Sequence, residues 1–148
     1  MKTTILLVIL CALIYSDEPT YGSAVVDTIL SVYDGDTFRC NIKGYPPIIG
    51  ENISIRFKSI DTPEIRGGSD CEKANAYKVR DYVEKRLRSA ETIILKDVSR
   101  PKYFRLMADV VVDGVDLGQE LLSLGYAYSY DGGTKKEWVC FKDSTEHK

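Results

Sequence analysis

The chain has 148 residues, a formal net charge of −2 and a single histidine, His147, next to the C-terminus. The length favours one domain, and without residues 1–23, which contain Lys2, Asp17 and Glu18, the charge becomes −1. This balance excludes a strong overall attraction to duplex DNA, so any binding of nucleic acid must come from a local cluster of Arg and Lys. The single histidine also argues against histidine-based catalysis and structural zinc.

Residues 1–23 differ in composition from the rest of the chain. Lys2 precedes an apolar run over residues 5–15, which polar and small residues follow. This order is typical of a secretory signal peptide, and the run is short for a membrane span of about 20 residues. We expect a signal peptide over residues 1–23, a folded domain over residues 24–148, and a secreted or periplasmic protein. An uncleaved N-terminal membrane anchor is the alternative.

Three cysteines, Cys40, Cys71 and Cys140, lie beyond the predicted signal peptide. In an oxidising compartment we expect one disulfide and one leftover thiol. The preferred pair is Cys71 with Cys140, because Cys40 falls in a predicted strand and is interpreted as a core residue. Spacing alone does not decide between this pairing and the others.

The first half of the chain predicts three strands. Residues 24–30 and 37–42 flank the dipeptide Asp34-Gly35, which is a strong hairpin signal. After a connection with two prolines, apolar and polar residues alternate over residues 53–60, as they do in a half-buried strand. The three strands form a predicted meander.

Charge is concentrated where the third strand ends. The strand carries Arg56 and runs into Asp61-Thr62-Pro63-Glu64, where the proline ends strand pairing. One strand and its exit turn therefore present a guanidinium and two carboxylates. We interpret this stretch as part of a polar site on a rigid support.

The second half predicts two helices and two more strands. Ser69 and Glu72 form a capping box for a helix that continues to Ala90, and strands follow over residues 92–98 and 104–112. A short helix is predicted over Leu117–Leu124. The expected fold is α+β and mainly β: a five-stranded Greek-key barrel of the oligonucleotide-binding (OB) type. One helix lies between its third and fourth strands, and a short helix follows its fifth.

Charged residues occur at the ends of three separate segments of the chain. They are Asp34 and Asp36 in the first segment, Arg56, Asp61 and Glu64 in the second, and Arg105 in the third. Carboxylates without histidine or thiolate partners suit a hard cation such as calcium, and guanidinium groups suit phosphate. A further carboxylate can take a proton from water. Together these groups predict a phosphodiesterase, although each segment alone is more typical of a turn or a surface ion pair.

The order and spacing of these segments resemble the thermonuclease (staphylococcal nuclease-like) family. The matching motifs are residues 32–37 (VYDGDT), Arg56 with residues 60–64 (IDTPE), and residues 102–105 (KYFR). The resemblance covers about residues 24–130. It implies an OB-fold barrel and a calcium-dependent, sugar-nonspecific endonuclease that hydrolyses DNA and RNA to 3′-phosphate products.

The resemblance also implies which residues bind the metal and activate water. Asp36 and Asp61 would bind Ca²⁺ through their carboxylates, and Thr62 would bind it through its carbonyl. Asp34 would lie behind these ligands. Glu64 would be the general base that acts on water.

The remaining roles concern the substrate. By the same resemblance, Arg56 and Arg105 would bind the scissile phosphate and stabilise its transition state, and Lys102 and Tyr103 would line the nucleotide pocket. The family usually has glycine where this chain has Phe104. If that position has a positive φ, Phe104 strains the turn and moves Arg105.

We expect DNA and RNA as substrates, single strands as the preferred form, no stable protein partner and a monomer. Tyr128 and Tyr130 are candidates for base stacking. An equally weighted alternative is that both are ordinary core or surface aromatic residues. One rival to the enzyme is a non-catalytic OB-fold module that binds single-stranded nucleic acid. Another is a secreted interaction domain whose loops calcium stiffens.

Overall fold

The computed structural model describes residues 19–101 and 104–141. The first 18 residues of the predicted signal peptide lie outside these ranges, as do Lys102 and Tyr103 of the predicted nucleotide pocket. Within the described ranges, no helix is both long and apolar enough to cross a membrane.

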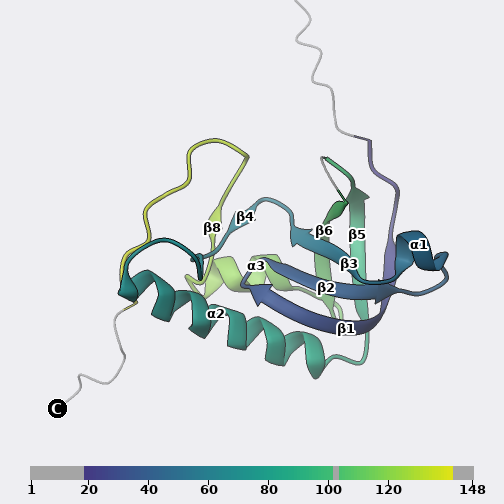
Figure 1. The fold of residues 1–148 in the computed structure, drawn as a ribbon, viewed down its shortest axis with the longest axis horizontal. Coiled ribbons are helices and arrows are strands. Elements are labelled where there is room, and N and C mark those ends of the chain that lie inside the picture. Colours follow the sequence, from purple (N-terminus) through teal and green to yellow (C-terminus); the bar gives the residue numbers. More distant parts are fainter. Residues whose placement is uncertain (1–18, 102–103, 142–148) are drawn as a thin grey trace, which may run out of the picture.

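Five strands form a closed barrel (Figure 1). In chain order they are β1 (Ala24–Asp34), β2 (Thr37–Ile42), β3 (Ile53–Phe57), β5 (Ile93–Ser99) and β6 (Arg105–Val112). Neighbouring strands pair in the order β3-β2-β1-β5-β6, and a parallel pairing of β3 with β6 closes the circle. The predicted fold class, a mainly β chain with a five-stranded OB-type barrel, is confirmed.

The apolar side chains of alternate strand positions fill the barrel. Phe38, Ile55 and Phe57 are buried in its interior, and the rings of Phe38 and Phe57 meet edge to face at 5.9 Å. Helix α2 (Asp70–Arg88) packs against β1, below the barrel in Figure 1, and its apolar stripe is buried. As the capping box predicts, Ser69 Oγ accepts a hydrogen bond from the Glu72 backbone N–H at 3.2 Å.

The shorter elements lie around this frame. They are α1 (Pro47–Gly50), β4 (Ile60–Asp61), β7 (Val115–Asp116), α3 (Leu117–Ser123) and β8 (Tyr128–Ser129). Strand β7 forms a hairpin with β6, and Asp116 caps α3, since its Oδ1 accepts the Gln119 N–H at 2.9 Å.

Two predicted elements need correction. The third strand ends at Phe57 instead of Ile60, because Ser59 has a positive φ of 58° that turns the chain out of the β3 ladder. Ile60 and Asp61 form the separate strand β4, which pairs with β8. The connection before β3 also contains the short helix α1, which begins with a proline at its first turn.

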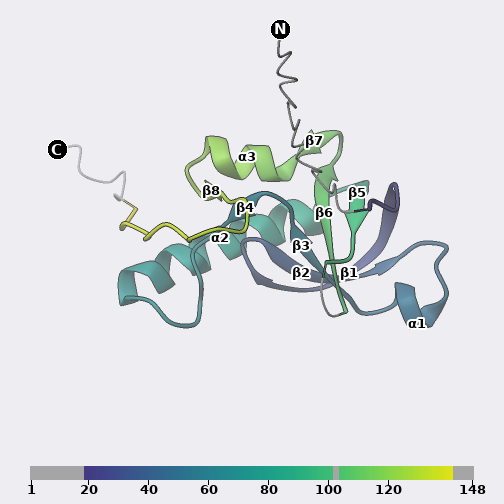
Figure 2. The same ribbon diagram turned by 90° about the horizontal axis from the view of Figure 1, so that it is seen from above.

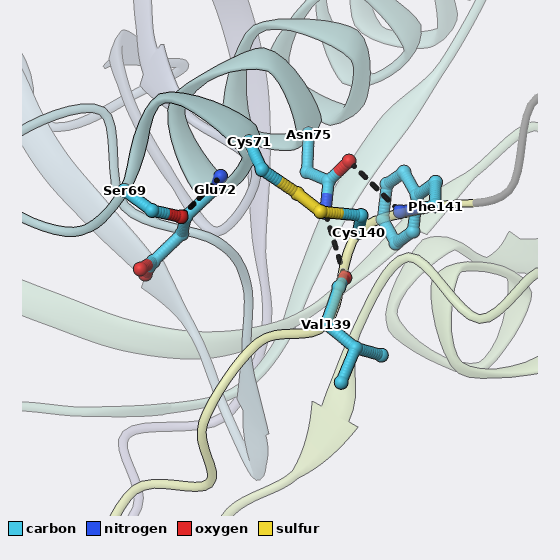
Figure 3. Close-up of a disulfide and its surroundings, with 7 residues drawn as sticks. All are labelled: Ser69, Cys71, Glu72, Asn75, Val139, Cys140 and Phe141. Atoms are coloured by element: carbon cyan, nitrogen blue, oxygen red, sulfur yellow. Dashed lines mark hydrogen bonds between the residues drawn. A yellow bond between two sulfur atoms is a disulfide. The ribbon is translucent and has the colours of Figure 1, made fainter.

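A disulfide joins Cys71 near the start of α2 to Cys140 near the end of the described chain (Figure 3). This is the pair that the sequence analysis preferred. Asn75, one turn further along α2, donates to the Val139 carbonyl at 2.9 Å and accepts from the Phe141 N–H at 3.2 Å. Cys40 is free and buried in the core, and burial raises the pKa of its thiol to about 12.

Candidate functional site

The β1–β2 turn lies directly against the residues that follow β4. A Cβ atom on Gly35 would lie 2.9 Å from Thr62 Cβ and 2.5 Å from Val79 Cγ1 of α2, so a larger residue does not fit without movement. Because the turn approaches so closely, Asp36 Oδ2 accepts a hydrogen bond from the Thr62 backbone N–H at 3.2 Å. Two of the three predicted metal ligands are therefore neighbours.

Arg56 lies between Asp36 and Asp61, the remaining predicted metal ligand. Its Nη1 donates to Asp36 Oδ1 at 2.6 Å, and its Nη2 lies 3.5 Å from Asp61 Oδ1. Asp36 and Asp61 are only 2% and 3% exposed, so the guanidinium compensates two carboxylates that water scarcely reaches. Since one guanidinium spans both carboxylates, the structure brings Asp36, Arg56 and Asp61 together.

Asp34 lies behind this cluster. Its Oδ1 accepts the Asp36 backbone N–H at 3.3 Å. Burial, together with the negative charge of Asp36, raises the pKa of Asp34 to about 7. Asp34 therefore carries only part of a negative charge at neutral pH, which limits repulsion within the buried cluster.

Glu64 lies at the exposed edge of the cluster, in the loop between β4 and α2. Its side chain is 51% exposed, and its carboxylate contacts the ammonium of Lys135. The same ammonium lies 2.9 Å from Asp61 Oδ1. Burial lowers the pKa of Lys135, but its contacts with Glu64 and Asp61 outweigh burial and raise that pKa above its ordinary value.

Sequence reasoning did not identify Lys135 as a site residue. It belongs to the Gly- and Lys-rich segment after β8, which carries no motif of its own. One signal was available, however. The preferred disulfide ties this segment to the start of α2, only a few residues after Glu64, so the segment has to pass the site.

Arg105 shares an outer face of the barrel with Arg56. In the parallel β3–β6 pairing, Ser54 is opposite Arg105 and Arg56 is opposite Met107. The intervening Ile55 faces the core, so the two arginines project on the same side, with Cα atoms about 8 Å apart by ordinary strand spacing. Arg105 is exposed, and the ion pairs found among the described residues of the site include Arg56 but not Arg105.

Phe104, which stands where the family usually has glycine, lies directly before Arg105 at the start of β6. The Phe104 ring is exposed, and the guanidinium carbon of Arg100 lies 5.0 Å from its centroid. The aromatic side chain therefore lies on the surface beside Arg100, and its effect on the turn before Arg105 stays a prediction.

A groove of about 550 Å³ begins at Arg56 and runs between β3 and the residues after β8. Tyr130 lines it, and of the two base-stacking candidates it is the one that lies beside Arg56. Tyr128 stacks on Trp138 instead, with ring centroids 4.0 Å apart and planes inclined by 10°. One face of the Tyr128 ring is thus already covered.

The donor set of the buried cluster fits a hard cation. Two carboxylates, from Asp36 and Asp61, adjoin Thr62, whose hydroxyl oxygen is buried without a hydrogen-bond partner among the described residues. Oxygen donors of this kind suit calcium or magnesium. In the described part of the chain, no three His, Cys, Asp or Glu side chains gather as a metal cluster, so a cation here needs neutral oxygens as well.

Residues 54–144 match the family described as staphylococcal nuclease homologue. The chain belongs to this family. The matched range contains Arg56, Asp61, Glu64 and Arg105, whereas Asp36 precedes it. The family points to a nuclease-like hydrolase that acts on nucleic acid, and its members are typically metal-dependent.

A similar protein is the uncharacterized protein MJ1439 of Methanocaldococcus jannaschii. It is 29% identical over 148 aligned positions, which cover 78% of this chain and 69% of the relative.

Proposed function

We propose that the protein is a calcium-dependent, sugar-nonspecific endonuclease that hydrolyses DNA and RNA and leaves 3′-phosphate products. The observation that carries this proposal is the cluster of Asp36, Arg56 and Asp61 beside Glu64, in a chain of the nuclease homologue family. A module that only binds single strands has no need for two buried carboxylates around one guanidinium with an exposed carboxylate beside them.

Calcium would be held by the carboxylates of Asp36 and Asp61 and by the carbonyl of Thr62. When bound there, it would polarise a phosphoryl oxygen and offset the charge of the substrate. Asp34 would adjust to this charge, because a group with a pKa of about 7 loses its remaining proton readily when a cation arrives nearby.

Arg56 would bind the scissile phosphate. Its two ion pairs use only part of the five N–H donors of a guanidinium, and it borders the groove beside β3. Arg105, on the same face of the barrel, would bind a second oxygen as negative charge builds up in the transition state.

Glu64 would take the proton of the attacking water. Its exposed carboxylate adjoins the buried cluster and can reach a solvent molecule. The water oxygen would bond to phosphorus as the bond from phosphorus to the 5′-oxygen breaks. The 5′-oxygen would leave as a hydroxyl with a proton from solvent, and the phosphate would stay on the 3′-oxygen. Single strands would be favoured, because their phosphates enter an open groove of this size more readily than those of a duplex. We also propose that a monomer acts after export.

The test is cleavage of labelled single-stranded DNA and RNA in calcium and in excess chelator. We expect cleavage in calcium only, and Glu64→Gln should lower kcat by about 10²–10⁴-fold. Glu51→Gln, at an exposed carboxylate just after α1, is the control and should cleave like the wild type. Binding of the strand in calcium without cleavage would overturn the enzyme in favour of a binding module.

A further inference from the structure

The segment after β8, residues 131–141, is held at both ends; we call it the strap. At its start, β8 pairs with β4, and the Tyr130 N–H donates to the Ser59 carbonyl at 2.9 Å. At its end, the disulfide and both hydrogen bonds of Asn75 fasten it to α2 (Figure 3). In both ribbon views the yellow strap leads from β8 back toward the first turns of α2 (Figure 1 and Figure 2).

Lys135, in the middle of the strap, forms ion pairs with the carboxylates of Asp61 and Glu64. Asp61 is buried in β4, whereas Glu64 lies on a loop and is half exposed. In the described part of the chain, Lys135 is the one side chain that forms an ion pair with Glu64. One ammonium from the strap therefore contacts both the Glu64 and the Asp61 carboxylates.

Lys136, the next residue in the strap, does not make the contacts that Lys135 makes with Glu64 and Asp61. The Lys136 ammonium lies over the Tyr128 ring, 5.4 Å from its centroid, and forms no ion pair among the described residues. Trp138 stacks on the same Tyr128 ring and limits rotation of the strap between its two ends. Both lysines border the pocket beside Asp61 and Glu64, but among the described residues only Lys135 forms ion pairs with these carboxylates.

We propose that Lys135 is a positioning residue of the site, which holds the Glu64 carboxylate against the Asp61 end of the metal cluster. This inference rests on the proposed function, in which Glu64 acts on water. Lys135 acts through Glu64: its ammonium restricts an otherwise exposed carboxylate to one location, and the disulfide restricts Lys135 in turn. No residue of the barrel supplies this restraint among the described contacts of Glu64.

The kinetic test compares Lys135→Gln, Lys135→Arg and the matched control Lys136→Gln in calcium. Lys135→Gln should lower kcat about tenfold and leave KM within about twofold, because the Glu64 carboxylate loses its location while the phosphate contacts of Arg56 remain. Lys135→Arg should recover most of kcat, and Lys136→Gln should match the wild type. In a Glu64→Gln background, Lys135→Gln should lower kcat much less, because only its ion pair with Asp61 remains to be lost.

Two kinetic results would overturn the inference. One is a Lys135→Gln enzyme within twofold of the wild type. The other is an equal loss of kcat in the wild-type and Glu64→Gln backgrounds, which would mean that Lys135 acts independently of Glu64.

A second measurement does not depend on cleavage. In chelator, Lys135→Gln should lower Tm by about 1–4 °C in the wild-type background and by much less in Glu64→Gln, as expected for a partly exposed ion pair. Lys136→Gln should show no such coupling to Glu64. If the wild type cleaves nothing, the proposed function fails, and this coupling alone decides whether Lys135 holds Glu64; equal Tm losses in both backgrounds would refute it.

Discussion

The candidate site has a buried half and an exposed half, and they are held in place differently. The buried half consists of Asp36, Arg56, Asp61 and Thr62, which come from the β1–β2 turn, from β3, and from the end of β4. The exposed half consists of Glu64 and Lys135, which come from a loop and from the strap. Ion pairs and a hydrogen bond join the barrel to β4 and Thr62 in the first half, whereas the second also needs the contacts that fasten the strap to α2.

The two halves also differ in how much their ion pairs contribute to stability. Ion pairs in the buried half are shielded from water, so removing one partner leaves an uncompensated charge in a poorly solvated place. The ion pair between Lys135 and Glu64 is partly exposed, so its loss has little effect on stability. We therefore expect changes in the buried half to appear as loss of folding, and changes in the exposed half to appear mainly in kcat.

The largest effect is expected from Arg56→Gln, measured in chelator. The substitution leaves the buried carboxylates of Asp36 and Asp61 without their shared guanidinium, so the free energy of unfolding in urea should fall by about 3–5 kcal/mol. Arg88→Gln is the control, because it removes an exposed ion pair with Glu84 and should change stability by less than about 0.5 kcal/mol. Equal effects of the two substitutions would show that the Arg56 cluster is not buried as described.

The next effect concerns the strap. Replacing Cys71 and Cys140 by Ala removes a crosslink between positions 69 residues apart, which should lower the free energy of unfolding by about 2–4 kcal/mol. In conditions where the variant is still folded, kcat should fall as it does in Lys135→Gln. Calcium affinity by titration calorimetry should not weaken, because the proposed ligands lie in the buried half and release of the strap only removes the Lys135 ammonium from Asp61.

A thiol count checks that the wild-type protein contains the disulfide between Cys71 and Cys140. In unfolded, unreduced mature protein without residues 1–23, one of the three cysteines, Cys40, should react, and three reactive thiols would contradict the disulfide. A variant without the disulfide that keeps the wild-type kcat would contradict the dependence of the exposed half on the strap.

The smallest of these effects on stability is expected from Gly35→Ala. The added methyl group would press on Thr62 and Val79, so unfolding free energy should fall by about 1–3 kcal/mol and the β1–β2 turn should shift. Because Asp36 lies next to this turn, calcium affinity should weaken as well, in contrast to the variant without the disulfide. Wild-type stability and calcium affinity in Gly35→Ala would contradict the close approach of the turn.

Most of the frame could be predicted from the sequence, because its signals are local. Alternating apolar residues, the Asp34-Gly35 hairpin and the capping box at Ser69 each act over a few residues. The break between β3 and β4 could not be predicted, since a serine with positive φ gives no sequence signal and the pattern of apolar residues continues to Ile60. That break matters for the site, because it turns Asp61 toward β8.

The kinds of groups in the site can be read from the chain alone: carboxylates, guanidinium groups and a proline turn, in an order that resembles the nuclease family. How these groups are paired follows only from the fold. Arg56 lies between Asp36 and Asp61, and Lys135 reaches Glu64 from a distant segment. The physical reason is that ion pairs between remote segments depend on barrel closure and on the disulfide, neither of which leaves a local pattern. The stretch from Arg56 to Glu64 therefore supplies much of the chemistry, while the β1–β2 turn and the strap complete the site.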